Sequence, residues 1–198
     1  RSWERFDPRS GWELKPGFMS EGIMVNRKGF RGPELSNGET FRIVCFGGSV
    51  TFGPRGEESP YPRALETFMN RFSPGKPVEV VNAGVTGHSS YNMRFRTDRI
   101  LRLNPDMIVI LTGPEDIMTE NISQYRDNRQ PFTSYWHVDS QRNVGLHVWS
   151  LFVETAGIGA RKTTPLTYTP EEFIPFNFEY NLSSVTNTFR KAGIPTAI

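Results

Sequence analysis

Short apolar runs alternate along this chain with longer stretches whose apolar residues recur at helical spacing. The runs are unbroken, as in strands buried on both faces of a sheet, and they cover residues 43–46, 78–81 and 107–111. The stretches with helical spacing cover about 59–72, 91–103 and 169–191, and residues 193–198 read as the entry to a fourth strand. This alternation with short connections predicts an α/β fold with a parallel, doubly wound sheet whose strand ends share one edge.

Two segments depart from the alternation. Residues 1–40 are rich in Gly, Pro and charge, with apolar residues at irregular spacing. They predict an extended N-terminal arm with one short hairpin, packed on the domain through its aromatic side chains, and a binding loop is the alternative. Residues from about 117 to 169 lose the periodicity, so we expect an irregular insert that is either a lid over the strand ends or an interaction surface. The remainder, residues 41–198, forms one domain that includes this insert.

Composition narrows the classes of function. With 198 residues, 36% of them hydrophobic, the chain suits a globular domain with a sizeable core. The formal charge of +2 comes from well-mixed acids and bases, which argues against a nucleic-acid partner. The densest basic stretch lies in the second predicted helix and reads as a solvated face: Arg94, Arg96, Arg99, Arg102. No apolar run has the length of a membrane span.

The first strand ends in the strongest candidate for chemistry. Gly47 and Gly48 follow the apolar run and Ser49 comes directly after them. Glycines permit a sharp turn, and the carboxyl edge of a parallel sheet is where ligands bind. A turn residue or helix cap is the alternative role for Ser49. Cys45, inside the strand, reads as a small core residue.

Cofactor and metal motifs are missing from the sequence. The glycines around Ser49 fit neither a phosphate-binding loop nor a dinucleotide-binding fingerprint. The three histidines, His88, His137 and His147, lack zinc-ligand spacing. We therefore expect neither a cofactor nor a metal ion.

Three loops together resemble the SGNH, or GDSL, hydrolase family. The first block is Phe46-Gly-Gly-Ser-Val, the second Asn82-Ala-Gly-Val-Thr-Gly and the third Gly113-Pro-Glu-Asp, where the family reads Gly-x-Asn-Asp. The segments around Gly11-Trp12 and Gly29-Phe30 also look like the leader of many bacterial members. The resemblance covers nearly the whole chain.

The resemblance implies a three-layer α/β/α sandwich of the flavodoxin-like, SGNH-hydrolase type. It also implies hydrolysis of ester bonds in small molecules, often acetylated sugars or lipids. By position, Ser49 is the nucleophile, and the N–H groups of Ser49 and Gly87 are oxyanion donors. His88 adjoins the second block, but the base of the family comes from a later block.

Two departures from the family pattern bear on activity. Glu115 stands at the Asn position that supplies the third oxyanion donor, and an ionised carboxylate only accepts hydrogen bonds. The D-x-x-H block that holds the family's base and its orienting acid is absent from the 198 residues, and we expect the natural chain to continue. A serine without a base is a weak nucleophile.

We therefore expect an SGNH-type serine ester hydrolase whose activity Glu115 places in doubt. The alternative is a non-catalytic structural or binding subunit with the same fold, part of a larger extracytoplasmic or membrane-associated assembly, which binds protein partners through the arm (1–40) and the insert (117–169). A third hypothesis is carbohydrate binding without turnover. We expect an extracytoplasmic location, periplasmic or secreted.

Overall fold

The computed structural model describes residues 2–20, 22–55, 59–72, 75–121 and 175–198. Its centre is a parallel sheet in which the three predicted strands are confirmed as β5 (Phe41–Gly47), β6 (Val78–Gly84) and β7 (Met107–Leu111). The fourth strand is confirmed as β8 (Thr196–Ala197), paired with β7. The strands lie in the order β6-β5-β7-β8, so the first strand of the sheet is internal, with β6 added on one side of it and β7 and β8 on the other.

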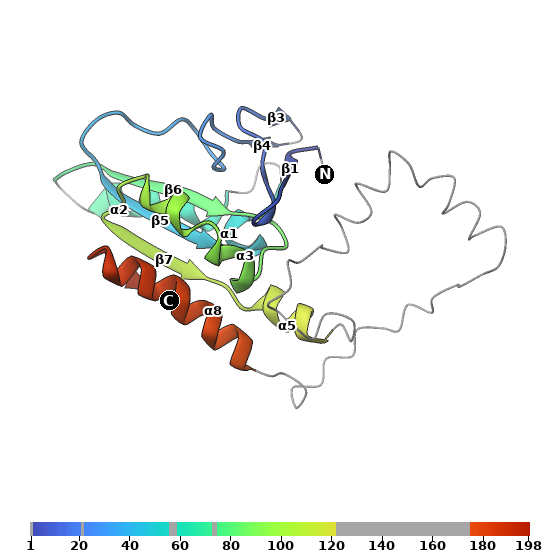
Figure 1. Ribbon diagram of the computed structural model, residues 1–198. Helices are drawn as coiled ribbons and strands as arrows, with labels where there is room; N and C mark the ends of the chain where they lie inside the picture. The colour runs from blue at the N-terminus through green and yellow to red at the C-terminus, as the bar shows by residue number, and fades with distance from the viewer. Residues whose placement is uncertain (1, 21, 56–58, 73–74, 122–174) are drawn as a thin grey trace, which may run out of the picture.

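Helices cover both faces of this sheet (Figure 1). One face packs on α3 (Ser90–Arg94), α4 (Thr97–Leu101) and α8 (Pro175–Lys191). Its core contains these side chains: Val44, Phe46, Val81, Met93, Ile100, Ile108, Ile110, Val185, Phe189. On the other face α2 (Tyr61–Phe72) packs on β6, and the Tyr61 hydroxyl hydrogen-bonds to Cys45. The three-layer α/β/α sandwich is confirmed.

The helix predicted over residues 91–103 is divided into α3 and α4. The break falls at Phe95 and Arg96, where the Arg96 side chain turns into the protein. Arg96 is 1% exposed and its guanidinium binds Glu13 and the carbonyl oxygen of Ala83. The prediction of a wholly solvated arginine face is therefore wrong for Arg96.

The first 35 residues contain two antiparallel pairs where one hairpin was expected. The first joins β1 (Glu4–Asp7) to β2 (Gly11–Leu14), and the second joins β3 (Met19–Ser20) to β4 (Ile23–Met24). Their aromatic and aliphatic side chains form a second apolar cluster with Phe52 and Val85: Trp3, Trp12, Leu14, Ile23, Val25. This cluster attaches the arm to the carboxyl edge of the sheet.

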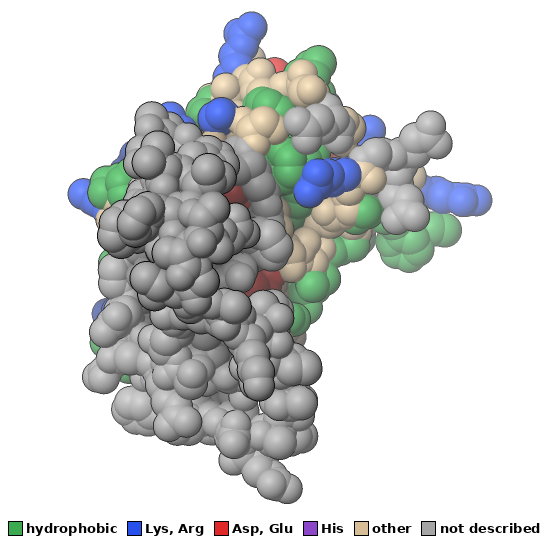
Figure 2. Space-filling model, turned by 90° about the vertical axis from the view of Figure 1, so that its right-hand side faces the viewer, with side chains coloured by type: hydrophobic (Ala, Val, Ile, Leu, Met, Phe, Trp, Pro, Cys, Tyr) green, Lys and Arg blue, Asp and Glu red, His purple; other side chains and the backbone are tan. Residues whose placement is uncertain are grey.

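The region after β7 starts with α5 (Pro114–Asn121), so the first residues of the predicted insert are helical. The rest of that insert, with His137 and His147, lies outside the described residues, as does the predicted start of α8. Figure 2 shows one face of the molecule, on which Lys and Arg side chains stand apart among hydrophobic and other residues. Among the helices in the described ranges, none combines the length and apolar character needed to cross a lipid bilayer.

Candidate active site at the carboxyl edge of the sheet

The strand order places the site. A parallel sheet opens a crevice where neighbouring strands send their connections to opposite faces, and ligands bind there, beyond the carboxyl ends of the strands. In this sheet that point lies between β5 and β7. Ser49 is separated from β5 by Gly48 alone and is the first residue of α1 (Ser49–Phe52), and Glu115 lies in the first turn of α5, after β7. Both residues therefore flank the crevice.

The structure brings Ser49 and Glu115 into direct contact. The Ser49 backbone N–H donates to Oε1 of Glu115 at 2.7 Å, and the Ser49 hydroxyl donates to the same oxygen. Ser49 is half-buried, whereas Glu115 is 8% exposed. One carboxyl oxygen thus accepts hydrogen bonds from both donor groups of Ser49, the hydroxyl and the N–H that was predicted to bind an oxyanion.

Gly48 makes this contact possible. A Cβ at Gly48 would lie 2.7 Å from the Glu115 carboxyl group and 2.6 Å from the carbonyl oxygen of His88. These separations are shorter than real Cβ contacts, so any other residue would displace the Glu115 side chain or the loop after β6. The glycine pair was predicted to allow a turn, and here one glycine also makes room for Glu115.

Asp116, adjacent to Glu115, has a different role. It is fully buried and accepts hydrogen bonds from the Ser90 N–H at 3.0 Å, the Ser90 hydroxyl at 2.5 Å and the Thr112 hydroxyl at 3.2 Å. These bonds tie α5 to the start of α3. Asp116 therefore stabilises the fold and holds α5 in the position in which Glu115 faces Ser49.

The loop between β6 and α3 forms the other wall of the site. The Val85 N–H donates to the carbonyl oxygen of Gly47 at 3.1 Å, which sets this loop beside the turn that carries Ser49. Gly87 is half-buried with φ +78°, a backbone conformation that favours glycine. His88 is fully buried, and its Nε2 lies 2.9 Å from the carbonyl oxygen of Trp12. In the described part of the chain, the Ser49 hydroxyl bonds to Glu115 and not to a histidine.

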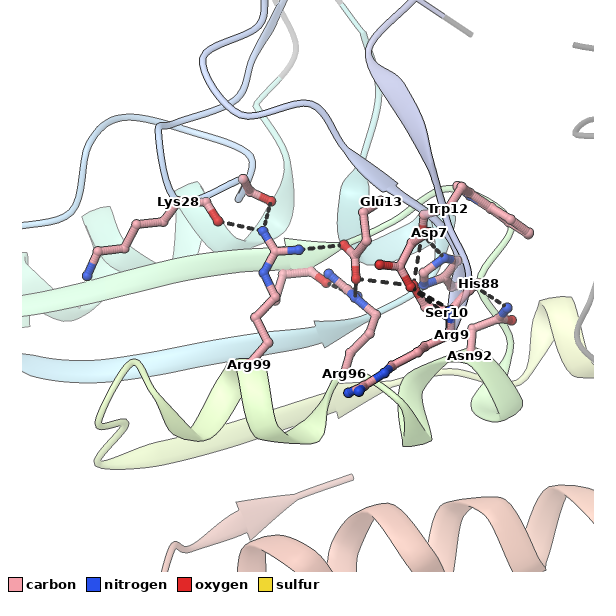
Figure 3. Close-up of polar contacts among 12 residues, drawn as sticks. Asp7, Arg9, Ser10, Trp12, Glu13, Lys28, His88, Asn92, Arg96 and Arg99 are labelled. Atoms are coloured by element: carbon pink, nitrogen blue, oxygen red, sulfur yellow. Dashed lines mark hydrogen bonds and ion pairs between the residues drawn. The ribbon is translucent and has the colours of Figure 1, made fainter. Parts of the chain in front are cut away.

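A buried charge cluster joins the arm to this wall (Figure 3). Glu13 of β2 lies between two arginines, with its Oε1 2.8 Å from Nε of Arg96 and its Oε2 2.9 Å from Nη1 of Arg99. The Asn92 side chain donates to the carbonyl oxygen of Ser10 at 2.9 Å. Sequence reasoning missed this cluster, because Glu13 lies 83 residues before Arg96 and no local pattern links them.

Cys45, buried in β5, and Tyr61, half-buried at the start of α2, form a hydrogen-bonded pair of weak acids. Burial raises the pKa of the Cys45 thiol to about 11, against a partial lowering by its hydrogen bond with Tyr61. Burial also raises the pKa of the Tyr61 hydroxyl. Both groups are neutral at physiological pH, and the prediction that Cys45 is a small core residue is confirmed. Among the described residues, no three His, Cys, Asp or Glu side chains converge as a metal site.

Comparisons with solved structures find similarity to esterases at low sequence identity. No family model and no curated protein matches it. A mutant of the esterase AlinE4 is 18% identical, over 81% of this chain and 77% of that chain, with a TM-score of 0.41. A mutant of Axe2, an acetylxylan esterase from Geobacillus stearothermophilus, is 14% identical over 82% and 77%, with a TM-score of 0.42. A lipolytic protein of the G-D-S-L family from Desulfitobacterium hafniense is 18% identical over 79% and 76%, with a TM-score of 0.36. The α/β/α sandwich follows from the chain's own strand order and helices, and it is similar to these two esterases and to this protein of the G-D-S-L family.

Proposed function

We propose that this protein is a serine ester hydrolase in which Ser49 is the nucleophile and Glu115 restrains it. The observation that carries the proposal is the paired donation from Ser49 to Glu115 Oε1. An ester hydrolase needs a hydroxyl beside the carbonyl carbon and an N–H aimed at the developing oxyanion. Here the hydroxyl and N–H of one residue already converge on a single carboxyl oxygen.

Glu115 opposes the reaction in this arrangement. Its carboxylate occupies the Ser49 N–H and repels any second anionic oxygen, whereas an Asn amide at this position would donate a hydrogen bond. Loss of one oxyanion donor lowers kcat by about 100- to 1,000-fold. We therefore expect slow hydrolysis by the wild-type protein and a gain of about that size when Glu115 is replaced by Asn.

A short-chain ester is the substrate class to test first, because half-buried Ser49 lies against a side chain that must move before a long acyl group can enter. Acetylated sugars or lipids as natural substrates are part of this proposal. The extracytoplasmic location and the protein partners of the arm and insert stay predictions.

The test is hydrolysis of 4-nitrophenyl acetate by four proteins: wild type, Ser49→Ala, Glu115→Asn and the double variant. We expect Glu115→Asn to be faster than wild type, and both proteins that lack Ser49 to fall to the buffer rate. A fluorophosphonate probe should add its mass to Ser49, more rapidly in Glu115→Asn. Equal rates with and without the Ser49 hydroxyl would contradict the proposal.

The second candidate is a non-catalytic subunit with this fold. The Glu115 carboxylate on the Ser49 N–H favours it, because the same hydrogen bonds also stabilise a closed, inert site. It predicts that Glu115→Asn gains nothing and that the probe does not label Ser49. The four-protein comparison therefore decides between the two functions.

A further inference from the structure

Trp12 of β2 holds the loop between β6 and α3 at two points. Its indole Nε1–H donates to the carbonyl oxygen of Thr86 at 2.9 Å, and its own carbonyl oxygen lies 2.9 Å from Nε2 of His88. The two rings meet edge to face, with centroids 4.8 Å apart. Trp12 is 2% exposed, and Figure 3 shows it beside His88 at the end of the arm hairpin. The arm thus contacts the wall of the site directly.

The first of these bonds bears on the direction of the Gly87 N–H, a group that we expect to bind the oxyanion. The carbonyl of Thr86 and the N–H of Gly87 belong to one peptide unit, which is planar and trans. In such a unit the C=O and the N–H point to opposite sides, so a bond that fixes the direction of the carbonyl also fixes the direction of the N–H. The indole N–H of Trp12 therefore sets where the Gly87 N–H points.

Gly87 needs such a restraint more than most residues. Its φ of +78° requires glycine, and a glycine peptide rotates more freely than any other. A Cβ at Gly87 would also approach the Trp12 ring to 3.2 Å, so the indole fits closely over this position. Trp12 itself lies in the hairpin that Glu13 secures to Arg96 and Arg99. The restraint is therefore supplied by a part of the fold that is itself held by buried ion pairs.

We propose that Trp12 is a positioning residue for ester hydrolysis: its indole N–H holds the Thr86 carbonyl so that the Gly87 N–H is aligned to stabilise the oxyanion. This inference rests on the proposed function, and on the role of oxyanion donor that the resemblance described under Sequence analysis implies for Gly87. An oxyanion donor acts only if it is aligned before the charge develops, because hydrogen bonds weaken steeply as they bend. The N-terminal arm is thereby part of the catalytic architecture.

The test compares Trp12→Phe with Trp3→Phe. Trp3 is 3% exposed and belongs to the same apolar cluster, so its replacement controls for the loss of an indole ring from that cluster. A third protein carries 3-benzothienylalanine at position 12, which keeps the shape of tryptophan and replaces the N–H by sulfur. This third variant keeps the test valid where Trp12→Phe fails to fold.

Two readouts separate positioning from a general structural role. The first is kcat and KM for 4-nitrophenyl acetate, in the wild-type and Glu115→Asn backgrounds. We expect both Trp12 variants to lower kcat by about 10- to 100-fold with little change in KM, because a misaligned donor loses part of the effect of a deleted one. The second is the ¹H–¹⁵N resonance of the Gly87 amide, which should shift in both Trp12 variants and stay in place in Trp3→Phe.

The outcomes are distinguishable from those of the proposed function. If the Trp12 variants match Trp3→Phe in kcat and in the Gly87 resonance, the positioning role is overturned. A hydrolysis rate that is the same in wild type and Ser49→Ala overturns the proposed function, and with it the role of Trp12 in positioning an oxyanion donor. Because the Gly87 resonance does not depend on turnover, it reports the contact between Trp12 and the loop in either case.

Discussion

The two walls that flank Ser49 are built in opposite ways. The loop after β6 is held from outside the sheet, by Trp12 and by the hairpin that Glu13 secures. The start of α5 is held from within, by Asp116 and its bonds to Ser90, while Glu115 beside it contacts Ser49. The comparison teaches that the loop after β6 depends on residues far away in the sequence. The start of α5 instead carries two adjacent acids, Asp116, which stabilises the fold, and Glu115, which we expect to be replaceable with little loss of stability.

The largest effect should come from Glu13→Gln. This change leaves Arg96, buried at 1% exposure, without its ionised partner, and breaking a buried pair in this way costs about 3–5 kcal/mol in the free energy of unfolding. Urea denaturation measures it. The matched control is Glu34→Gln, whose pair with Arg27 spans 4.0 Å at the surface and should matter by less than about 1 kcal/mol. Similar losses of stability in Glu13→Gln and Glu34→Gln would show that the ion pairs of Glu13 do not hold the arm on the domain.

Next in size is Asp116→Asn. An amide at this position turns an N–H₂ group toward hydrogen-bond donors, so we expect a loss of about 1.5–3 kcal/mol. Glu115→Gln is the control on the neighbouring residue, and its side-chain oxygen can still accept from Ser49, so its cost should stay under about 1 kcal/mol. Denaturation of both variants under one condition checks the contrast. Equal losses in the free energy of unfolding would show that Asp116 and Glu115 contribute alike to stability, against this prediction.

Gly48→Ala should destabilise the protein by as much as Asp116→Asn or by less. The added methyl overlaps the Glu115 carboxyl and the His88 carbonyl, and overpacking of this kind costs about 1–3 kcal/mol. Combining it with Glu115→Ala isolates the part due to the carboxyl group, because the backbone overlap with His88 remains. Gly75→Ala is the control, since nothing lies within 4 Å of a Cβ there. A purely additive double variant would mean that Gly48 does not serve Glu115.

The smallest effect concerns pH. The pKa of Cys45 is raised by burial from 9.0 to about 11, so its contribution to stability is complete below pH 9 and is lost as the pH rises toward 11. At pH 10 the loss should be about 1 kcal/mol. Cys45→Ala should flatten this part of the decline, and the remainder reports Tyr61, whose pKa is also raised. Thermal unfolding between pH 8 and 11 measures both. A pH-independent stability over this range would contradict the buried thiol.

The sequence predicted the parts of the site that follow from local pattern. Unbroken apolar runs gave β5 and β7, and parallel strands must send their loops to one edge, so Ser49 and Glu115 were expected together. The direct bond between them depends on side-chain rotamers that no spacing encodes. The burial of Arg96 was missed because arginines at helical spacing read as a solvated face, and the carboxylate that pairs with the buried charge, Glu13, is far away in the chain. The Trp12 contact with Thr86 was missed for the same reason, since 74 residues separate them.

The arm precedes the sheet in the chain, yet its partners are translated later. Trp12 and Glu13 leave the ribosome before Thr86 and Arg96 exist, and at the usual rate of synthesis they wait on the order of ten seconds. β5 also waits, because it lies between β6 and β7 and lacks both neighbours when it emerges. The arm is therefore made before the groups that hold it, and it can dock only after the loop beyond β6 and the residues of α3 and α4 have been synthesised. Until then Trp12 lacks the carbonyl oxygen that its indole N–H binds in the folded protein.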